Sequence, residues 1–486
     1  MREIVPVNDD SNTQLKLSTA IPNSNFDRSR DRGEDGEIPS KSRNMTSASL
    51  SFEGMLDYLS QAIRKIPDPR QASNATRYRL SDVLVGAFSV FFMQCESFLE
   101  HQRQMQSRRG KDNAQSLFGL GEIPSTPQIR NLLDEVEAVS LFEVFFKIYA
   151  ALMQDGYLQP YQQWNGQLLV ALDGTEYFKS QKIHCQCCSS RTRKNGSVTY
   201  FHQAILPVIV APSQTQVIAL APEFITPQDG HGKQDCEVAA AKRWISAHAA
   251  RLQPQPITLL GDDLYSHQPM CEHCLQHHLS FIFTCLPESH PALYDWLNYL
   301  EANGEIKTLE TQHWNKRTQE IYRYRYVNQI PLRDTQPTLL VNWCEFTLLR
   351  QSDGKVLYSS AFVTNHLLTS ETVPQVVSGG RSRWKTENEN HNVLKTKGYH
   401  LEHNFGHGQH HLASGLLTLN VLAFLFHTVL HLVDRSYQQI RQQRGTRKGF
   451  FQDMLALTKY IWFESWQHLL DFMLSDSPAS QPADSS

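Results

Sequence analysis

Apolar residues recur at helical spacing in the first third of the chain, in three stretches that prolines separate. The stretches are FEGMLDYLSQAI, LSDVLVGAFSVFFMQ and LFEVFFKIYAALM. An apolar residue at every third or fourth position places one apolar stripe along a helix. The pattern therefore predicts an all-helical N-terminal domain over residues 51–160, with the prolines in its connections.

A strand pattern begins near Gln167. Three apolar runs, QLLVALDG, TYFHQAILPVIVAP and TQVIALAPEFI, precede the amphipathic stretch KQDCEVAAAKRWISAHAARL. Two further runs, PITLLGDD and LSFIFTCL, have another amphipathic stretch between them. Strands followed by alternating helices and strands are typical of a mixed sheet covered by helices. We therefore expect an α/β domain over residues 161–410.

Four more strand-like segments interrupt this order and predict a β-rich insertion at about residues 287–365. IKTLETQ, EIYRYRYVN, LLVNWCEFTLLR and VLYSSAFVT alternate in polarity, and Asp353-Gly354 marks a hairpin. A helix, RSRWKTENENHNVLKTKG, is expected next, with Gly398 ending it. Helical spacing then returns over residues 411–475. Within it, Leu416–Val433 is apolar enough for a membrane span, but Asn420, His427 and His431 favour a buried helix.

Composition changes this picture at the two ends of the chain. Residues 1–50 and 476–486 are polar and predict disordered tails, and the start MREIVPVNDD lacks the apolar segment of a signal peptide. Nine cysteines, an odd number, favour reduced thiols and a cytoplasmic protein. The formal net charge of −3 supplies no general attraction for nucleic acid, so any DNA contact must come from local basic groups.

Two aspartates end strand runs where they could bind metal together. Asp173 closes QLLVALD and Asp262 closes PITLLGD. Carboxylates at the ends of neighbouring strands converge above a sheet, and a carboxylate from a later helix would complete a site for two Mg²⁺ or Mn²⁺ ions. The alternative for each aspartate is an ordinary turn or helix cap. Asp263 competes with Asp262, and Glu389 competes with Glu387 for the third position.

These residues and their surroundings resemble the insertion-sequence transposases that have a ribonuclease-H-like core and three acidic residues (DDE). The similarity covers roughly residues 160–430, and the closest branch carries a β-rich insertion before the catalytic Glu. The motifs are LDGTEYF after Asp173, D-x-x-Y from Asp262, and R-x3-E from Arg383 to Glu387. The pattern departs at Gly380, where the family has Tyr, and at Leu394, where it has a Lys that here comes one residue later.

The resemblance implies a DNA transposase that cleaves the ends of an insertion sequence and joins them to target DNA. Asp173, Asp262 and Glu387 would hold Mg²⁺, and Arg383 and Lys395 would contact DNA. The implied partners are terminal inverted repeats and target DNA, bound by a homodimer, with the helical N-terminal domain recognising the ends. The implied setting is the cytoplasm of a prokaryote, at the nucleoid. A nuclease that does not join strands and a DNA-binding protein without catalysis are the alternatives.

Two other patterns carry chemistry. Cys185-x2-Cys188 and Cys271-x2-Cys274 have the spacing of a structural Zn²⁺ site, with free thiols as the alternative. A zinc hydrolase built on them lacks an HExxH motif. In EIYRYRYVN, Arg323 and Arg325 share one strand face, which would contact DNA or simply face solvent. The eight histidines from His391 to His431 show no consistent ligand spacing. GxxxxGK[ST] and GxSxG are absent, which removes motif support for an NTPase or an α/β-hydrolase.

Overall fold

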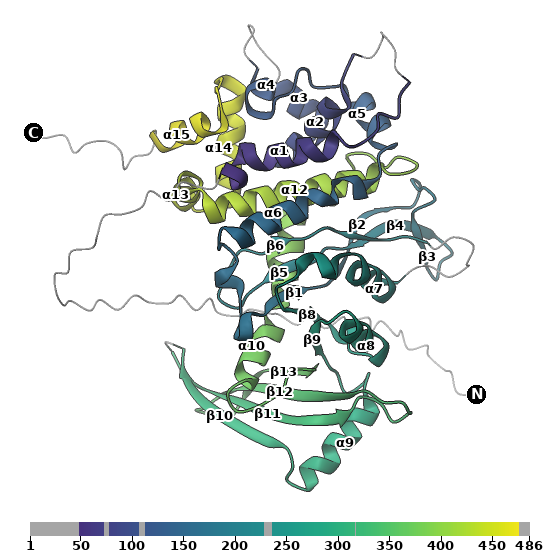
Figure 1. Ribbon diagram of the computed structural model, residues 1–486, viewed down its shortest axis with the longest axis vertical. Coiled ribbons are helices and arrows are strands. Elements are labelled where there is room, and N and C mark those ends of the chain that lie inside the picture. The colour runs from purple at the N-terminus through teal and green to yellow at the C-terminus, as the bar shows by residue number, and fades with distance from the viewer. Residues whose placement is uncertain (1–47, 72–76, 106–111, 228–235, 316, 476–486) are drawn as a thin grey trace, which may run out of the picture.

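The computed structural model describes residues 48–71, 77–105, 112–227, 236–315 and 317–475. Helices occupy one end of the long axis, the central strands lie in the middle, and the predicted insertion forms the other end (Figure 1). Most of the predicted N-terminal tail and all of the C-terminal tail fall outside the described residues. Residues 106–111 also fall outside them.

The helical end combines the two ends of the chain. From the N-terminal part come α1 (Phe52–Ile63), α2 (Leu80–Phe92), α3 (Phe98–Met105), α4 (Asn113–Phe118), α5 (Thr126–Leu133) and α6 (Phe142–Gln154). From the C-terminal part come α12 (Leu412–Val433), α13 (Arg435–Arg444), α14 (Arg447–Tyr460) and α15 (Trp466–Ser475). α2 packs on α12, with the rings of Phe88 and Phe426 4.8 Å apart. Both groups of helices therefore share one hydrophobic core.

Helix α12 is the apolar stretch that the sequence presented as either a core helix or a membrane span. It is long and apolar enough to cross a membrane, yet 89% of its most apolar window is buried inside the protein. Its polar groups have partners there: Asn420 donates to the Tyr399 carbonyl at 2.7 Å, and a His427 ring nitrogen lies 2.8 Å from the Phe92 carbonyl oxygen. Burial with hydrogen-bond partners for the Asn420 amide nitrogen and the His427 ring is the arrangement of a core helix.

A mixed sheet of nine strands runs through the molecule in the order β10-β11-β12-β13-β9-β8-β1-β5-β6. Its central strands are β1 (Leu168–Ala171), β5 (Val208–Val210), β6 (Ile218–Ala219), β8 (Ile257–Gly261) and β9 (Ser280–Thr284). β1, β8 and β9 are parallel, whereas β5 and β6 form an antiparallel edge. The helices between these strands are α7 (Glu237–His248) and α8 (Gln268–Gln276). The predicted mixed α/β arrangement is present.

A second, smaller sheet was not expected. It contains β2 (Gly174–Ser180), β3 (Ser189–Thr192), β4 (Val198–Ile205) and β7 (Glu223–Ile225). The run TYFHQAILPVIVAP, predicted as one strand, is two: β4 belongs to the small sheet and β5 to the large one. Pro207 separates them because it has no N–H to donate to a ladder.

The insertion extends the large sheet rather than forming a separate one. It comprises α9 (Pro291–Ala302), β10 (Lys307–Trp314), β11 (Gln319–Pro331), β12 (Leu340–Arg350) and β13 (Val356–Thr364). β13 pairs antiparallel with β9, which joins the insertion to the central strands. All four strand-like segments of the sequence are strands here, and the connection at Asp353-Gly354 is a turn.

The helix predicted from Arg381 to Gly398 is broken into segments. α10 (Val373–Arg381) ends where that helix was expected to begin, and a π-helical turn spans Thr386–His391 before α11 (Asn392–Thr396). A π turn closes its hydrogen bonds over five residues instead of four and therefore accommodates one additional residue. Such turns occur frequently at functional sites.

Short 3-10 turns complete the described structure. They span Ala48–Leu50, Ala138–Leu141, Gln159–Tyr161, Trp164–Gly166, Ala249–Leu252 and Asp263–Tyr265. The last of these starts directly after Asp262, whose side chain accepts a hydrogen bond from the Leu264 N–H at 2.9 Å. Asp262 therefore caps a turn. A turn or helix cap was the alternative role that the sequence offered for this residue.

Candidate active site

Asp173 and Asp262 follow two neighbouring parallel strands at the same level. In the β1–β8 register Ala171 lies opposite Leu260, and the Leu172 N–H donates to the Leu260 carbonyl at 2.9 Å. Asp173 comes two residues after Ala171, and Asp262 comes two residues after Leu260. Because paired strands lie about 4.8 Å apart, the two carboxylates are close neighbours at the carboxyl edge of the sheet. Asp262 and Asp173 accordingly interact electrostatically.

Glu387 joins these aspartates from the π-helical turn. Its carboxylate acts electrostatically on Asp173, and its Oε1 lies 3.7 Å from an Nη atom of Arg383. Its competitor Glu389 points elsewhere, into a separate pocket that it lines with His431, Arg441 and Arg447. The geometry therefore favours Glu387 as the third acidic residue, and its catalytic role stays a prediction.

The competitor of Asp262 is also engaged elsewhere. Asp263 accepts a hydrogen bond from the Leu286 N–H at 2.7 Å, and its carboxylate lies 3.8 Å from a His290 ring nitrogen. These contacts attach the turn after β8 to the segment after β9. Asp263 thus has a structural explanation, which leaves Asp262 as the better candidate for a metal ligand.

A fourth carboxylate at this edge was missed in the sequence. Glu237, at the first turn of α7, accepts hydrogen bonds through Oε1 from the Gly174 N–H at 3.1 Å and from the Tyr265 hydroxyl at 2.7 Å. A Cβ on residue 174 would lie 2.5 Å from Glu237 Oε2, so glycine permits this close approach. The only signal in the sequence was an acidic residue at the start of the helix that precedes the Asp262 strand.

Two of these carboxyl groups, Asp173 and Glu237, have raised pKa values. The pKa of Asp173 is raised to about 7, mainly by burial; Arg383 opposes this rise, and Glu237, Glu387 and Asp262 contribute to it. Burial likewise raises the pKa of Glu237, against the hydrogen bond from Tyr265. Partly buried carboxylates of like charge are unfavourable unless protons or cations neutralise them. Strongly perturbed carboxyl groups are a feature of functional sites.

The donor set fits a hard divalent cation. Carboxylate oxygens are the ligands of Mg²⁺ and Mn²⁺ in proteins. The ligand atoms of the cysteine–histidine group described below all lie within 4.8 Å of one another. In the part of the chain that the structure describes, these carboxylates do not form so compact a cluster. Glu387 is held by Arg383 and remains half exposed, so it can turn toward a cation that Asp173 and Asp262 hold.

Lys395 lies one residue later than the resemblance requires. The π turn that contains Glu387 changes which face of the helix Lys395 occupies. A regular helix would place it on a different face from Glu387, but the additional residue in Thr386–His391 changes the phase of the helix. Leu394, at the expected position, is completely buried, whereas Lys395 is partly exposed and lies near His391. Its Nζ pairs with Glu402 Oε1 at 3.1 Å. Its contact with DNA stays a prediction.

The two insertion arginines differ in their surroundings. Arg325 pairs with Glu301 at 2.7 Å and Glu345 at 2.9 Å, so its guanidinium already has two carboxylate partners. Arg323 makes one exposed pair with Glu310, at 2.5 Å. The tyrosines that alternate with them, Tyr324 and Tyr326, are buried. These contacts favour a structural role for Arg325 and leave Arg323 more accessible.

The four cysteines predicted to share a metal do not lie together. Cys185 and Cys188 gather instead with His202 and His407, and the ligand atoms of these four residues all lie within 4.8 Å of one another. Cys271 and Cys274 are buried in α8, where burial raises the pKa of Cys274 to about 12. A buried neutral thiol packs as a small apolar group. The structure therefore favours the free-thiol alternative for the second pair, and the sequence analysis missed His202 and His407.

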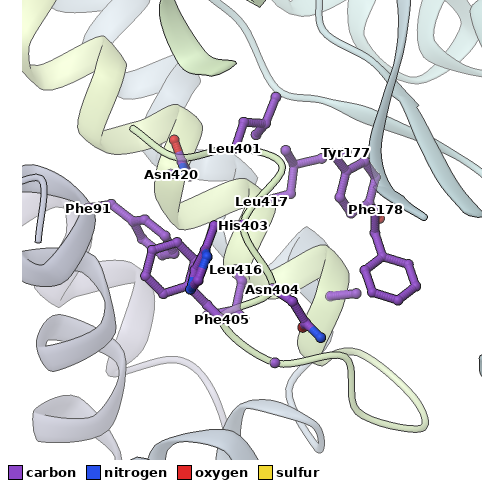
Figure 2. Close-up of a pocket in the computed structure, with 12 residues that line it drawn as sticks. Phe91, Tyr177, Phe178, Leu401, His403, Asn404, Phe405, Leu416, Leu417 and Asn420 are labelled. Carbon is purple, nitrogen blue, oxygen red and sulfur yellow. The ribbon is translucent and has the colours of Figure 1, made fainter. Parts of the chain in front are cut away.

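A small pocket of about 30 Å³ lies between the helical end and β2. Figure 2 shows Tyr177 and Phe178 on one side of it and the segment from Leu401 to Phe405 beside them. The volume suits about one water molecule, and the lining is mainly apolar. This pocket is a packing gap near the cysteine–histidine group and not a substrate site.

Comparisons with known proteins add little to this geometry. No family model matches the chain, and no curated protein matches it by sequence. Among solved structures, a piggyBac transposase in a synaptic complex with hairpin DNA is similar, at 10% sequence identity and a TM-score of 0.38. The alignment covers 90% of this chain and 83% of that one. At such a TM-score the likeness carries no argument about fold or function.

Proposed function

We propose that this chain is a DNA transposase that uses divalent metal ions to cleave and join phosphodiester bonds. The observation that carries the proposal is the placement of Asp173 and Asp262 at matching positions after parallel strands β1 and β8, with Glu387 near enough to act electrostatically on Asp173. A ribonuclease-H-like core would require such a site. The order β6-β5-β1-β8-β9, with three parallel strands and an antiparallel edge, supports that fold.

Each group in the site has a role in this chemistry. Asp173, Asp262 and Glu387 would hold Mg²⁺ or Mn²⁺. When bound, these ions supply the positive charge that activates the attacking oxygen and stabilises the leaving oxygen. Arg383, which is partly buried beside Glu387, is placed to grip a DNA phosphate through two N–H groups. Glu237 keeps the turn after β1 in position through its bond to the Gly174 N–H.

Two successive reactions at this site would complete transposition. Water first cleaves at the end of the element, and the released 3′-hydroxyl then attacks target DNA. The partners are therefore terminal inverted repeats and target DNA, and pairing of two ends requires at least a homodimer on DNA. We assign recognition of the ends to helices α1–α6 and place the protein in a prokaryotic cytoplasm, at the nucleoid.

Cleavage of labelled duplex DNA tests the proposal. The substrate carries the sequences that flank the coding segment of the element, and Mg²⁺ or Mn²⁺ is supplied. We expect wild-type protein to cut at the repeat boundary and to join the new 3′ end to a target plasmid. Asp173→Asn, Asp262→Asn and Glu387→Gln should each abolish both reactions while DNA binding is retained.

Glu389→Gln is the matched control, because Glu389 lies two residues from Glu387 but points into another pocket. It should cut as wild type does. If Glu389→Gln is inactive and Glu387→Gln is active, the third ligand is misassigned. Cutting without joining would identify a nuclease. Tight binding of the repeats without any cutting would overturn the catalytic proposal.

A further inference from the structure

The ligand atoms of the cysteine–histidine group all lie within 4.8 Å of one another, and four of the six distances between them are 3.5–3.9 Å. The Sγ atoms of Cys185 and Cys188 are 3.9 Å apart. The Nε2 atom of His202 lies 3.5 Å from each of these sulfurs, and the Nε2 atom of His407 lies 3.6 Å from Cys188 Sγ. Three of the four residues are buried and the fourth, Cys185, is partly buried.

These distances are the edges of a metal-centred tetrahedron. Zinc binds sulfur at about 2.3 Å and nitrogen at about 2.0–2.1 Å, which separates two sulfurs by about 3.8 Å and a sulfur from a nitrogen by about 3.6 Å. A disulfide would require about 2.05 Å between the two sulfurs. We propose that Cys185, Cys188, His202 and His407 bind one structural Zn²⁺ ion.

The surroundings suit a closed structural site. The rings of Tyr177 and His202 stack at 5.6 Å, and those of Phe178 and His407 lie 4.3 Å apart. The His202 ring also bonds to the backbone of Cys187. Such a backbone partner orients the His202 imidazole as a ligand. Four protein ligands fill a tetrahedral zinc, so the ion has no open position for catalysis.

The ion would join segments that are distant in the sequence. Cys185 and Cys188 lie between β2 and β3, His202 is in β4, and His407 is in the loop between α11 and α12. β2 begins at Gly174, directly after Asp173, and the His407 loop follows the helical segment of Glu387. Zinc would therefore hold β2, which follows Asp173, against the loop that follows the helical segment of Glu387.

The His407 loop is prepared for this position by contacts that do not involve the metal. Asp134 accepts hydrogen bonds from the N–H groups of Gln409, His410, His411 and Leu412, at 2.8–3.0 Å. Arg130 donates to the Phe405 carbonyl at 2.7 Å. A Cβ on residue 408 would lie 2.2 Å from an Asp134 oxygen, so glycine is required next to His407.

Metal analysis of the purified full-length chain tests the proposal, and the second CxxC pair provides a matched control. Wild type should contain about one zinc per chain by elemental analysis. Cys185→Ser with Cys188→Ser, and separately His407→Asn, should lose it. Cys271→Ser with Cys274→Ser should retain it. A wild-type protein that neither contains zinc nor takes it up, or zinc lost only with Cys271 and Cys274, overturns the site.

A measurement on the unmutated protein covers the case in which the variants fail to fold. Thiol alkylation followed by peptide mass mapping reports which cysteines become accessible when a chelator removes zinc. Cys185 and Cys188 should react after chelation and be protected again when Zn²⁺ is restored, while Cys271 and Cys274 stay protected throughout. Reactivity of Cys185 and Cys188 that does not change with zinc contradicts the proposal.

Discussion

The Nδ1 atom of His391 lies 3.6 Å from Oδ2 of Asp173. His391 ends the π-helical turn that carries Glu387, so this contact connects the helical part of the acidic site to the strand part. The pKa of His391 is lowered to about 3, mainly by burial, with contributions from Lys395 and Arg383. The ring is therefore neutral at physiological pH and can orient the carboxylate without adding charge.

Removing this ring should weaken metal binding. Partners of metal-binding carboxylates typically contribute about 10–100-fold in affinity. We expect His391→Leu to raise the Mn²⁺ concentration for half-maximal cleavage about 10-fold. His391→Asn, whose amide can reach the position of Nδ1, should recover part of that loss. Equal Mn²⁺ requirements in wild type and His391→Leu would show that the contact has no positioning role.

Asp173→Asn should stabilise the protein when a chelator is present. The pKa of Asp173 is raised from 3.8 to about 7, so folding favours its protonated form. The associated stability is complete below pH 3.8 and is lost as the pH rises through 7. At pH 8 the neutral variant should be more stable by up to about 4 kcal/mol in urea unfolding. A less stable variant would contradict this, and added Mn²⁺ should stabilise wild type only.

Glu237→Gln separates the charge of Glu237 from its hydrogen bonds. The glutamine oxygen can still accept from Gly174 and Tyr265, so the melting temperature should be unchanged or higher. Cleavage should fall about 10-fold or more if the charge helps to hold the metal ions. Glu237→Ala should also cost about 1–3 kcal/mol, because the buried Tyr265 hydroxyl loses its partner. Full activity in Glu237→Gln would assign Glu237 a purely structural role.

Replacing the two insertion arginines should have different effects on protein stability and on DNA binding. Arg325→Ala leaves Glu301 and Glu345 without their shared partner and should lower stability by about 1 kcal/mol. Arg323→Ala should leave stability nearly unchanged but reduce the salt dependence of DNA affinity by about one phosphate contact. Binding titrations at several salt concentrations measure this slope. A slope that changes only in Arg325→Ala would reverse the assignment.

His101 should make the protein sensitive to acid. It is fully buried, neither ring nitrogen has a hydrogen-bond partner among the described residues, and burial lowers its pKa from 6.5 to about 3. Its neutral form therefore stabilises the fold above pH 6.5, and this contribution is lost as the pH falls below that value. At pH 5.5 the loss should be about 1 kcal/mol. His101→Leu should flatten the pH dependence of unfolding by that amount, and an unchanged slope would refute the prediction.

The sequence by itself determined most of the elements and three of the carboxylates at the candidate site. Periodicity located the N- and C-terminal helices, the central parallel strands and all four strands of the insertion. A helix or strand that is buried on one face has apolar residues at the spacing of its own geometry, and this spacing can be read from the sequence. Asp173 and Asp262 were recognisable because each ends an apolar run. Parallel strands bring such ends together without further information about packing.

Only the tertiary structure decided which distant residues meet. Glu237 and His391 reach Asp173 from helices whose orientation depends on packing. His202 and His407 join Cys185 across long stretches of chain, whereas Cys271 and Cys274, with the same spacing as the first pair, face the core. The π turn was equally hidden, since one additional residue alters the phase of a helix without altering its composition. Local patterns specify local conformation, but a site made from several segments depends on how the whole core packs.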